Sequence, residues 1–162
     1  ALLGSDLTLH IDTEAGQPLD VAALLGGCGA TDELYVCGPG VMLAAVQAQA
    51  QARGWPQERI HFEVFSTAAP AAGDAAFDVV LAQSGKTVQV PAGKTILQCL
   101  IDAGCDPLFD CQRGECGVCA VPVIEGAIEH RDFVLTQRER DAGNVMQVCV
   151  SRAKGARLVL DL

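Results

Sequence analysis

Short apolar segments alternate with polar turns in the second half of the chain, and their spacing changes from that of strands to that of a helix. Apolar runs at 77–82 and 87–91 predict two strands joined by a turn that contains glycine. Between 96 and 101 the apolar residues recur at helical spacing, and Thr95 stands where its side chain can cap the helix. Gly104 is expected to end this helix.

Farther along the chain the pattern returns to short strands. Strands are predicted at 120–124, 146–150 and 157–162, and a helix is predicted at 135–142. The helix opens with a capping-box sequence, in which Thr136 is followed three positions later by an acidic residue. Two strands, a helix and further strands in this order are typical of a β-grasp, so we expect an α+β fold for this half.

In the first half, apolar strands alternate with helical segments. Strands are predicted at 7–11, 34–37 and 59–65, and helices at 18–25 and 41–53. This alternation predicts an α/β segment with a parallel sheet. Three strands and two helices at most would leave a sheet edge uncovered, so we expect an incomplete part of a larger domain.

A stretch of small residues separates the two halves. Residues 66–76 are dominated by alanine and show no apolar periodicity, which predicts a linker. The expected organisation is therefore an incomplete α/β segment at 1–65, a linker at 66–76 and a β-grasp domain at 77–162.

Composition and charge exclude some classes of partner. The chain has 162 residues, half of them hydrophobic, so it can bury one core or two small ones. Its net charge of −9 argues against nucleic acid, whose phosphates would repel it. No run of 18 apolar residues occurs, so no membrane-spanning helix is expected.

Four of the eight cysteines follow the pattern C-x4-C-x2-C-x29-C. They are Cys111, Cys116, Cys119 and Cys149. This is the plant-type spacing for the ligands of a [2Fe–2S] cluster, whose irons are held by four thiolates. Gly114 and Gly117 suit the loop between them, because backbone without a Cβ can approach the inorganic sulfides and donate N–H groups to them. The sequence therefore predicts a one-electron carrier.

Other uses of these cysteines fit less well. A disulfide framework requires secretion, yet no apolar signal segment opens the chain. Structural zinc favours close pairs, and Cys149 has no partner two or three residues away. A thioredoxin-like motif at Cys116 and Cys119 would leave Cys111 unexplained, and a Rieske centre needs two histidines where only His130 is near. A zinc-stabilised interaction domain remains as the alternative.

Some residues outside this motif are also candidates for function. Gly38-Pro39-Gly40 follows a predicted strand and opens a helix, where free N–H groups suit an anionic or carboxamide group; a plain structural turn is the alternative. No glycine-rich phosphate loop stands upstream of residue 34. Several acidic residues surround the cysteine loop, as a solvated face or as a docking surface for a basic partner. They are Asp102, Asp106, Asp110 and Glu115.

The order of these motifs resembles the phthalate dioxygenase reductase family, which includes the vanillate O-demethylase reductases. Its members carry an FMN domain, an NAD domain and a C-terminal plant-type ferredoxin domain. The matching segments are Tyr35-Val36-Cys37-Gly38-Pro39, Gly54-Trp55-Pro56, 59–65, 111–119, His130-Arg131-Asp132, Leu135-Thr136, 149–153 and 158–162. The family's FMN domain and the glycine-rich part of its NAD domain have no counterpart here, so we expect a C-terminal fragment of a longer reductase.

The resemblance implies a path from NADH through FMN and the [2Fe–2S] cluster to a Rieske-type oxygenase that acts on an aromatic acid. It implies that Cys37, a candidate catalytic residue, lies with Gly38 and Pro39 beside the nicotinamide, and that Phe65 lies near the flavin. A stand-alone ferredoxin is the alternative. Free cysteines together with a cluster point to the cytoplasm.

For the cluster, the resemblance implies that Cys111 and Cys116 bind one iron, and that Cys119 and Cys149 bind the other. Arg113 and Glu115 are expected to tune the cluster's potential by charge or hydrogen bonding.

Overall fold

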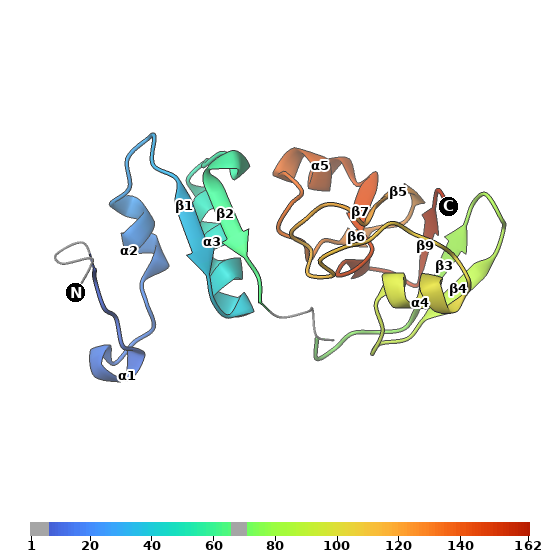
Figure 1. Ribbon diagram of the computed structural model, residues 1–162, viewed down its shortest axis with the longest axis horizontal. Helices are drawn as coiled ribbons and strands as arrows, with labels where there is room; N and C mark the ends of the chain where they lie inside the picture. The colour runs from blue at the N-terminus through green and yellow to red at the C-terminus, as the bar shows by residue number, and fades with distance from the viewer. Residues whose placement is uncertain (1–6, 66–70) are drawn as a thin grey trace. The chain divides into compact units, whose positions relative to one another are not determined.

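The computed structural model describes residues 7–65 and 71–162, and the chain divides into two compact units, Ala1–His61 and Phe62–Leu162 (Figure 1). Part of the predicted linker, 66–70, lies outside the described residues. The division of the chain into domains at 65 and 77 stays a prediction.

The larger unit contains a mixed sheet with one helix packed on it. Its elements are β3 (Phe77–Leu81), β4 (Thr87–Val90), α4 (Ile96–Asp102), β5 (Ala120–Glu125), β6 (Ile128–Glu129), α5 (Gln137–Ala142), β7 (Val145–Gln147), β8 (Arg152–Ala153) and β9 (Arg157–Leu160). Five strands pair in the order β4-β3-β9-β5-β7, and β6 pairs with β8 in a separate two-stranded sheet. β3 runs antiparallel to β4 and parallel to β9. This arrangement confirms the expected α+β class.

Alternating apolar positions build the core of this unit. Val79 on β3 lies opposite Leu158 on β9, and both side chains are fully buried. Leu97 and Leu100 of α4 belong to the same buried cluster. Burying each such side chain contributes about 1.5–3 kcal/mol, so these contacts hold the sheet and helix in one fixed arrangement. The helix begins where predicted, because Thr95 and the glutamine three residues later form a reciprocal capping box.

The strand predicted at 146–150 is shorter in the structure. β7 ends at Gln147, whose carbonyl oxygen accepts hydrogen bonds from the backbone N–H groups of Val150 and Ser151. The chain therefore turns at 148–150 instead of continuing as a strand. Cys149 stands on this turn, which is how a distant residue is brought back toward the cysteine loop.

The N-terminal part contains α1 (Asp12–Ala15), α2 (Val21–Gly26), β1 (Leu34–Cys37), α3 (Gly40–Ala52), a 3-10 turn (Gln57–Arg59) and β2 (Ile60–Glu63). β1 and β2 form a two-stranded sheet, and their arrows point the same way in Figure 1. This is the incomplete α/β segment that the sequence predicted.

The strand predicted at 7–11 is wrong. The described sheet pairs β1 only with β2, so no neighbouring strand supplies hydrogen-bond partners for these residues. Leu7 and Leu9 are instead exposed. Among the described residues, no helix is long and apolar enough to cross a bilayer.

Candidate metal centre

The C-terminal pair of predicted ligands, Cys119 and Cys149, is brought together by the pairing of β5 with β7. Ala120 lies opposite Gln147 in this ladder, so the residues just beyond them are neighbours. The backbone N–H of Val148 donates to the carbonyl oxygen of Cys119 at 3.2 Å. The two sulfur atoms lie 3.0 Å apart, and both side chains are buried. The β5–β7 pairing and the turn at 148–150 together therefore set the geometry of this pair.

The other pair, Cys111 and Cys116, lies on the irregular loop between α4 and β5. The Cys116 thiol is close enough to Cys111 to contribute to lowering the pKa of the Cys111 thiol. Cys116 is exposed and Cys111 is partly buried, so this pair faces the surface. The two pairs are those that the family resemblance implies for the two irons, and the role of the four cysteines as ligands stays a prediction.

Backbone N–H groups of the loop point at the sulfur atoms of both pairs. The N–H of Arg113 donates to Cys111 Sγ at 3.3 Å, and the backbone N–H groups of Glu115 and Cys116 also contribute to lowering the pKa of this thiol. The N–H of Gly114 donates to Cys149. These donors favour negative charge at the sulfurs, as a thiolate-ligated cluster requires.

Gly114 is required by its surroundings. Its φ is +78°, and a Cβ added there would lie 2.8 Å from Val150 Cγ2 and 3.0 Å from the Cα of Asp132. Gly117 has a φ of +79°, but an added Cβ would meet Val134 at an ordinary 3.5 Å. The first glycine is thus needed for space and for backbone conformation, and the second for conformation alone.

The electrostatics of the cysteines fit a ligand role. The hydrogen bond from Cys149 lowers the pKa of Cys119 to about 7, whereas the same contact raises the pKa of Cys149. Burial acts to raise the pKa of Cys111, but the backbone N–H groups of Arg113 and Glu115 together with the thiol and backbone N–H of Cys116 outweigh it, and the pKa is lowered. Each pair therefore contains one thiol whose pKa is lowered, and thiolates are the form that binds iron.

The donor chemistry of these residues fits a [2Fe–2S] cluster. Four thiolates shared between two irons give each iron two protein ligands. Two separate thiol pairs, flanked by amide donors and without histidine, meet that requirement.

Arg113 was predicted to tune the potential of the cluster, and in the structure its side chain contacts a carboxylate. Its guanidinium forms an ion pair with Glu115, with 2.7 Å between Nη2 and Oε1. Its backbone N–H donates to the candidate ligand Cys111. Tuning of the cluster by this side chain stays a prediction.

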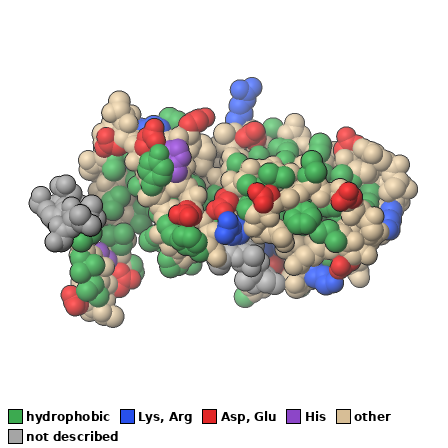
Figure 2. Space-filling view, viewed as in Figure 1, with side chains coloured by type: hydrophobic (Ala, Val, Ile, Leu, Met, Phe, Trp, Pro, Cys, Tyr) green, Lys and Arg blue, Asp and Glu red, His purple; other side chains and the backbone are tan. Residues whose placement is uncertain are grey.

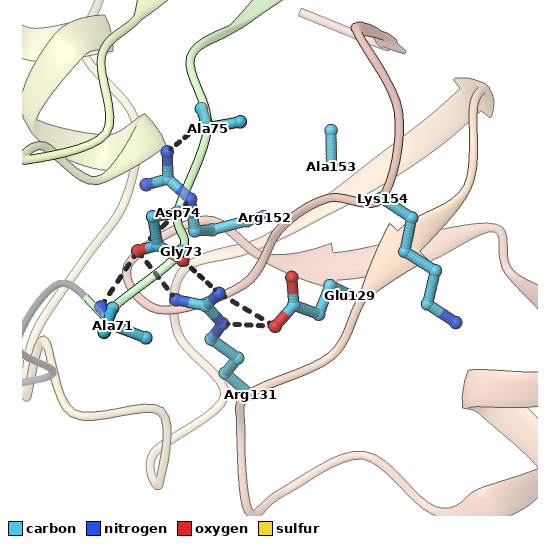
Figure 3. Close-up of a pocket in the computed structure, with 10 residues that line it drawn as sticks. Ala71, Gly73, Asp74, Ala75, Glu129, Arg131, Arg152, Ala153 and Lys154 are labelled. Atoms are coloured by element: carbon cyan, nitrogen blue, oxygen red, sulfur yellow. Dashed lines mark hydrogen bonds and ion pairs between the residues drawn. The ribbon is translucent and has the colours of Figure 1, made fainter.

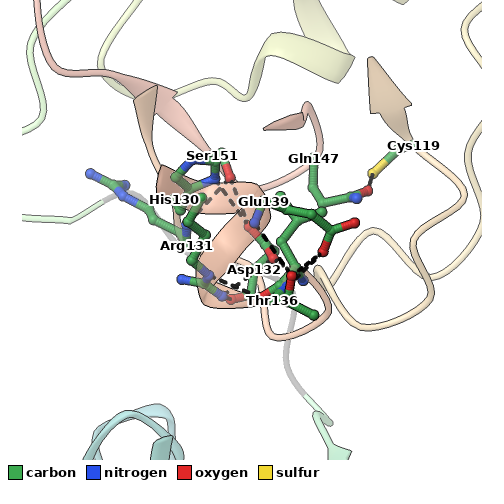
Figure 4. A network of polar contacts seen from close by, with 10 residues as sticks. Cys119, His130, Arg131, Asp132, Thr136, Glu139, Gln147 and Ser151 are labelled. Carbon is green, nitrogen blue, oxygen red and sulfur yellow. Dashed lines mark hydrogen bonds and ion pairs between the residues drawn. The ribbon is translucent and has the colours of Figure 1, made fainter. Parts of the chain in front are cut away.

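Asp132, a buried carboxylate beside the loop, was given no role from the sequence. Asp132 accepts hydrogen bonds from the backbone N–H of Leu135 at 2.8 Å and from Ser151 Oγ at 3.5 Å (Figure 4). The next residue, Phe133, donates its N–H to the carbonyl oxygen of Gly114 at 2.8 Å. Gln147 is also buried and accepts a hydrogen bond from the Cys119 thiol. In the sequence, only the family motif that includes Asp132 indicated that these residues support the cysteine loop.

The residues of the N-terminal part that were predicted to lie beside the nicotinamide and the flavin each have a defined local environment. Cys37 is the last residue of β1 and is exposed, so it does not behave as a buried strand-end cysteine. Pro39 caps α3 and accepts the N–H of Met42, while a Cβ on Gly38 would collide with the end of the Met42 side chain. Phe65 is exposed. Their roles toward a nicotinamide and a flavin stay predictions.

Comparison with known proteins gives consistent results. Residues 79–154 match the 2Fe-2S iron-sulfur cluster binding domain. The vanillate O-demethylase oxidoreductase of Pseudomonas sp. is 43% identical over 148 residues, which cover 90% of this chain and 46% of that protein. The chain spans about half the length of the curated relatives it matches.

Two solved structures are similar as well. Phthalate dioxygenase reductase, described as a modular structure for electron transfer from pyridine nucleotides to [2Fe-2S], is 34% identical with a TM-score of 0.62 over 98% of this chain and 49% of its own. The structure of Pseudomonas putida CBB5 NdmA with the ferredoxin domain of NdmD matches at 36% identity and a TM-score of 0.52, covering 54% of this chain and 99% of the matched one.

Proposed function

Given that this chain belongs to the phthalate dioxygenase reductase family, whose members carry a C-terminal [2Fe–2S] ferredoxin domain, we propose that it is the electron-transfer part of such a reductase. The intact enzyme would couple oxidation of NADH, by way of FMN, to reduction of a Rieske-type oxygenase that acts on an aromatic acid. Plant-type clusters have potentials of about −400 mV and Rieske centres of about −150 to +300 mV, so electron flow toward the oxygenase is favourable.

The observation that carries this proposal is the pairing of the four cysteines inside the matched domain. Cys111 and Cys116 would hold one iron near the surface, and Cys119 and Cys149 would hold the other in the interior. When bound, the cluster supplies a centre that accepts and releases one electron at a time. The backbone N–H groups of 113–116 offset its negative charge, and the buried pair excludes water from one side.

The exposed side of the loop is suited to a partner protein. Asp106 and Asp110 are exposed and form no ion pair within the part of the chain that the structure describes. Asp102 is paired with Lys94 and Glu115 with Arg113, so these two are largely neutralised. A basic surface on the oxygenase would meet the two unpaired carboxylates, beside the exposed thiol of Cys116.

Residues of the N-terminal part would contribute to the NADH side of the intact enzyme. Cys37, Gly38 and Pro39 would lie beside the nicotinamide, and Phe65 near FMN. In the longer reductase, Cys37→Ala is expected to slow reduction of the flavin by NADH while leaving the iron content unchanged. A reducing compartment, the cytoplasm, fits the eight free cysteines.

Absorption and EPR spectroscopy test the cofactor. Anaerobically prepared protein should contain two irons and two sulfides per chain and give an S = ½ signal after reduction by dithionite. A colourless protein that contains zinc and no iron would support the zinc-stabilised domain instead. If the longer protein, with FMN added, does not oxidise NADH, a stand-alone ferredoxin is the better description.

Cys149→Ser tests the ligand assignment. The variant should lose the cluster, and with it part of the folding stability of residues 77–162, because metal binding is coupled to folding. Cys105→Ser is the matched control, since Cys105 lies close to Cys111 in sequence but outside the ligand spacing. Full iron and sulfide content in Cys149→Ser would contradict the assignment.

A further inference from the structure

Asp132 lies between the two segments that carry the candidate cluster ligands, and its side chain is fully buried (Figure 4). On the loop side, its Cα lies 3.0 Å from the position that a Cβ on Gly114 would occupy, and the N–H of Phe133 donates to the carbonyl oxygen of Gly114 at 2.8 Å. On the other side, Ser151, two residues after Cys149, donates its Oγ–H to Oδ1 of Asp132 at 3.5 Å. The carboxylate is therefore held next to both segments and away from water.

Arg140 supplies a positive charge beside this carboxylate. Its Nη2 lies 3.4 Å from Oδ2 of Asp132 and donates to the backbone carbonyl oxygen of the same residue at 2.5 Å. Its Nε donates to the carbonyl oxygen of Leu135 at 3.0 Å, which holds the guanidinium in place. The ring of His130 lies 3.6 Å from Asp132, but burial lowers the pKa of His130, so the ring adds no positive charge at neutral pH.

The arginine that directly precedes Asp132 in sequence pairs with other carboxylates (Figure 3). Arg131 binds Asp74 with both terminal nitrogens, at 2.5 Å to Oδ1 and 3.1 Å to Oδ2, and the side chain of Asp74 is 5% exposed. Nη2 of Arg131 also lies 2.8 Å from Oε1 of Glu129. Among the residues that the structure describes, Arg140 is therefore the one arginine or lysine that pairs with Asp132.

A buried charge at this place acts on the electron affinity of the cluster. Reduction adds one negative charge to the cluster, so a neighbouring carboxylate opposes it and a neighbouring guanidinium favours it. An ionised carboxylate only accepts hydrogen bonds, and the groups bonded to Asp132 (the N–H of Leu135, the hydroxyl of Ser151 and the guanidinium of Arg140) are all donors. Because the side chain of Asp132 is buried, water and salt screen its charge less than that of a surface carboxylate.

We propose that the buried charge of Asp132 lowers the reduction potential of the cluster, and that Arg140 partly offsets this effect. The inference rests on the proposed function, because it requires that the four cysteines hold a [2Fe–2S] cluster. A lower potential makes the reduced cluster a stronger reductant, which favours electron flow toward a Rieske centre. Since the two side chains carry opposite charges, removing one or the other should shift the potential in opposite directions, whereas a loss of structural support has no such sign.

A redox titration of the anaerobically prepared protein, followed by EPR, measures this potential. In the half-reaction, the oxidised cluster takes up one electron from a mediator, and no bond forms or breaks. Asp132→Asn should raise the equilibrium constant for reduction about tenfold, as Coulomb's law gives for unit charges about 10 Å apart at an effective dielectric constant of about 20. For a one-electron couple, a tenfold change corresponds to about 59 mV. Arg140→Gln should lower the same constant, by a smaller factor because its side chain is 17% exposed.

Asp141→Asn and Arg138→Gln are the matched controls, because they remove the same two charges from exposed positions of α5. Both should keep the potential and the iron content of the wild type, since charges at the surface are screened by water and salt.

The direction of each shift decides the outcome. An Asp132→Asn potential at or below that of the wild type overturns the inference, and so does an Arg140→Gln potential at or above it. Should Asp132→Asn lose the cluster, the shift in Arg140→Gln decides alone. Loss of the cluster from both variants would show that this network only supports the loop, and would overturn the inference as well. A wild-type protein that holds no iron overturns the proposed function instead.

Discussion

At the scale of single residues, the cysteine loop depends on backbone conformation as much as on its thiols. Gly114 and Gly117 share a positive φ, yet only Gly114 has backbone atoms of another segment within 3.0 Å of an added Cβ. The Gly114 amide also donates to Cys149, so a shift there moves a donor away from a candidate ligand. The same substitution at Gly114 and at Gly117 can therefore separate the cost of the backbone conformation from the cost of the steric clash.

We expect Gly114→Ala to reduce the cluster content and to destabilise the unit by more than Gly117→Ala. A left-handed conformation costs a non-glycine residue about 1–3 kcal/mol in both variants, and Gly114→Ala adds a clash with Asp132 and Val150. Iron and sulfide analysis and denaturant unfolding measure the difference. Equal losses in the two variants would show that the close approach at Gly114 has no energetic consequence.

His130 is a buried histidine beside this network. Its side chain is 10% exposed, and neither ring nitrogen has a hydrogen-bond partner among the described residues. Burial lowers its pKa, and the positive charges of Arg140 and Lys154 act in the same direction. The carboxylate of Asp132, 3.6 Å from Nδ1, opposes them without reversing the shift.

The stability of the unit should therefore fall as the pH drops below about 6.5, where the unfolded chain binds a proton at His130 and the folded chain resists it. His130→Gln should make this dependence shallower. Unfolding free energies measured from about pH 8 to pH 5 test this, and the high-pH end, where histidine is neutral in both states, is the internal reference. An unchanged slope in the variant would contradict the prediction.

The functional residues that could be predicted from the sequence have their partners nearby along the chain, whereas those that were missed have partners far away along the chain. The cysteine loop was recognisable because three ligands and two glycines lie within nine positions, from Cys111 to Cys119. Asp74 and Arg131 are 57 residues apart, and nothing local marks the side chain of Asp74 as buried. Charged residues are read from sequence as exposed unless a partner is known, and the fold alone supplies that partner.

At the scale of elements, local signals predicted helix starts well and strand ends poorly. Thr95 and Thr136 begin helices through capping boxes, which are contained within four residues. The end of β7 at Gln147 depends on the turn that brings Cys149 to Cys119, and the short strands β6 and β8 depend on each other. The failed strand at 7–11 has the same cause, because a strand exists only through its partner.

Thr136→Ala should destabilise α5, which is short and contains no buried residue. Thr136 Oγ1 accepts the N–H of Glu139 at 3.3 Å, and the Glu139 carboxylate accepts the N–H of Thr136 at 2.8 Å. Loss of such a cap costs about 1 kcal/mol. Amide hydrogen exchange should rise first within 137–142, and release of Arg140 should then loosen the Asp132 network.

Arg138→Ala is the comparison variant for this helix, since it changes an exposed helical residue and leaves the capping box intact. It should leave exchange in the rest of α5 near the wild-type level. Faster exchange spread evenly over residues 77–162 in Thr136→Ala would instead indicate global unfolding, and would contradict a local role for the cap.

At the scale of the whole molecule, the net charge of −9 and the unpaired carboxylates of Asp106 and Asp110 predict that partner encounter is steered by charge. The rate of electron transfer to the oxygenase should fall as salt rises, because the screening length shrinks from about 30 Å at 0.01 M to about 10 Å at 0.1 M. Leu108, Phe109 and Val118 are exposed on the same loop, and they offer apolar contact once the partner has arrived.

Asp110→Asn separates local steering from the effect of overall charge when it is compared with Asp161→Asn. Both variants remove one negative charge, but Asp161 lies at the C-terminal end and is hydrogen-bonded to Gln83 at 3.2 Å, whereas Asp110 directly precedes the candidate ligand Cys111. Asp110→Asn should lower the bimolecular rate at low salt several-fold more than Asp161→Asn, and the two should converge at about 1 M salt, where the screening length is about 3 Å. Because a change at the surface affects encounter and not the cluster itself, the EPR signal should be the same in both. Equal rates at low salt would mean that net charge alone steers the encounter, and that the acidic side chains beside the loop do not mark the docking surface.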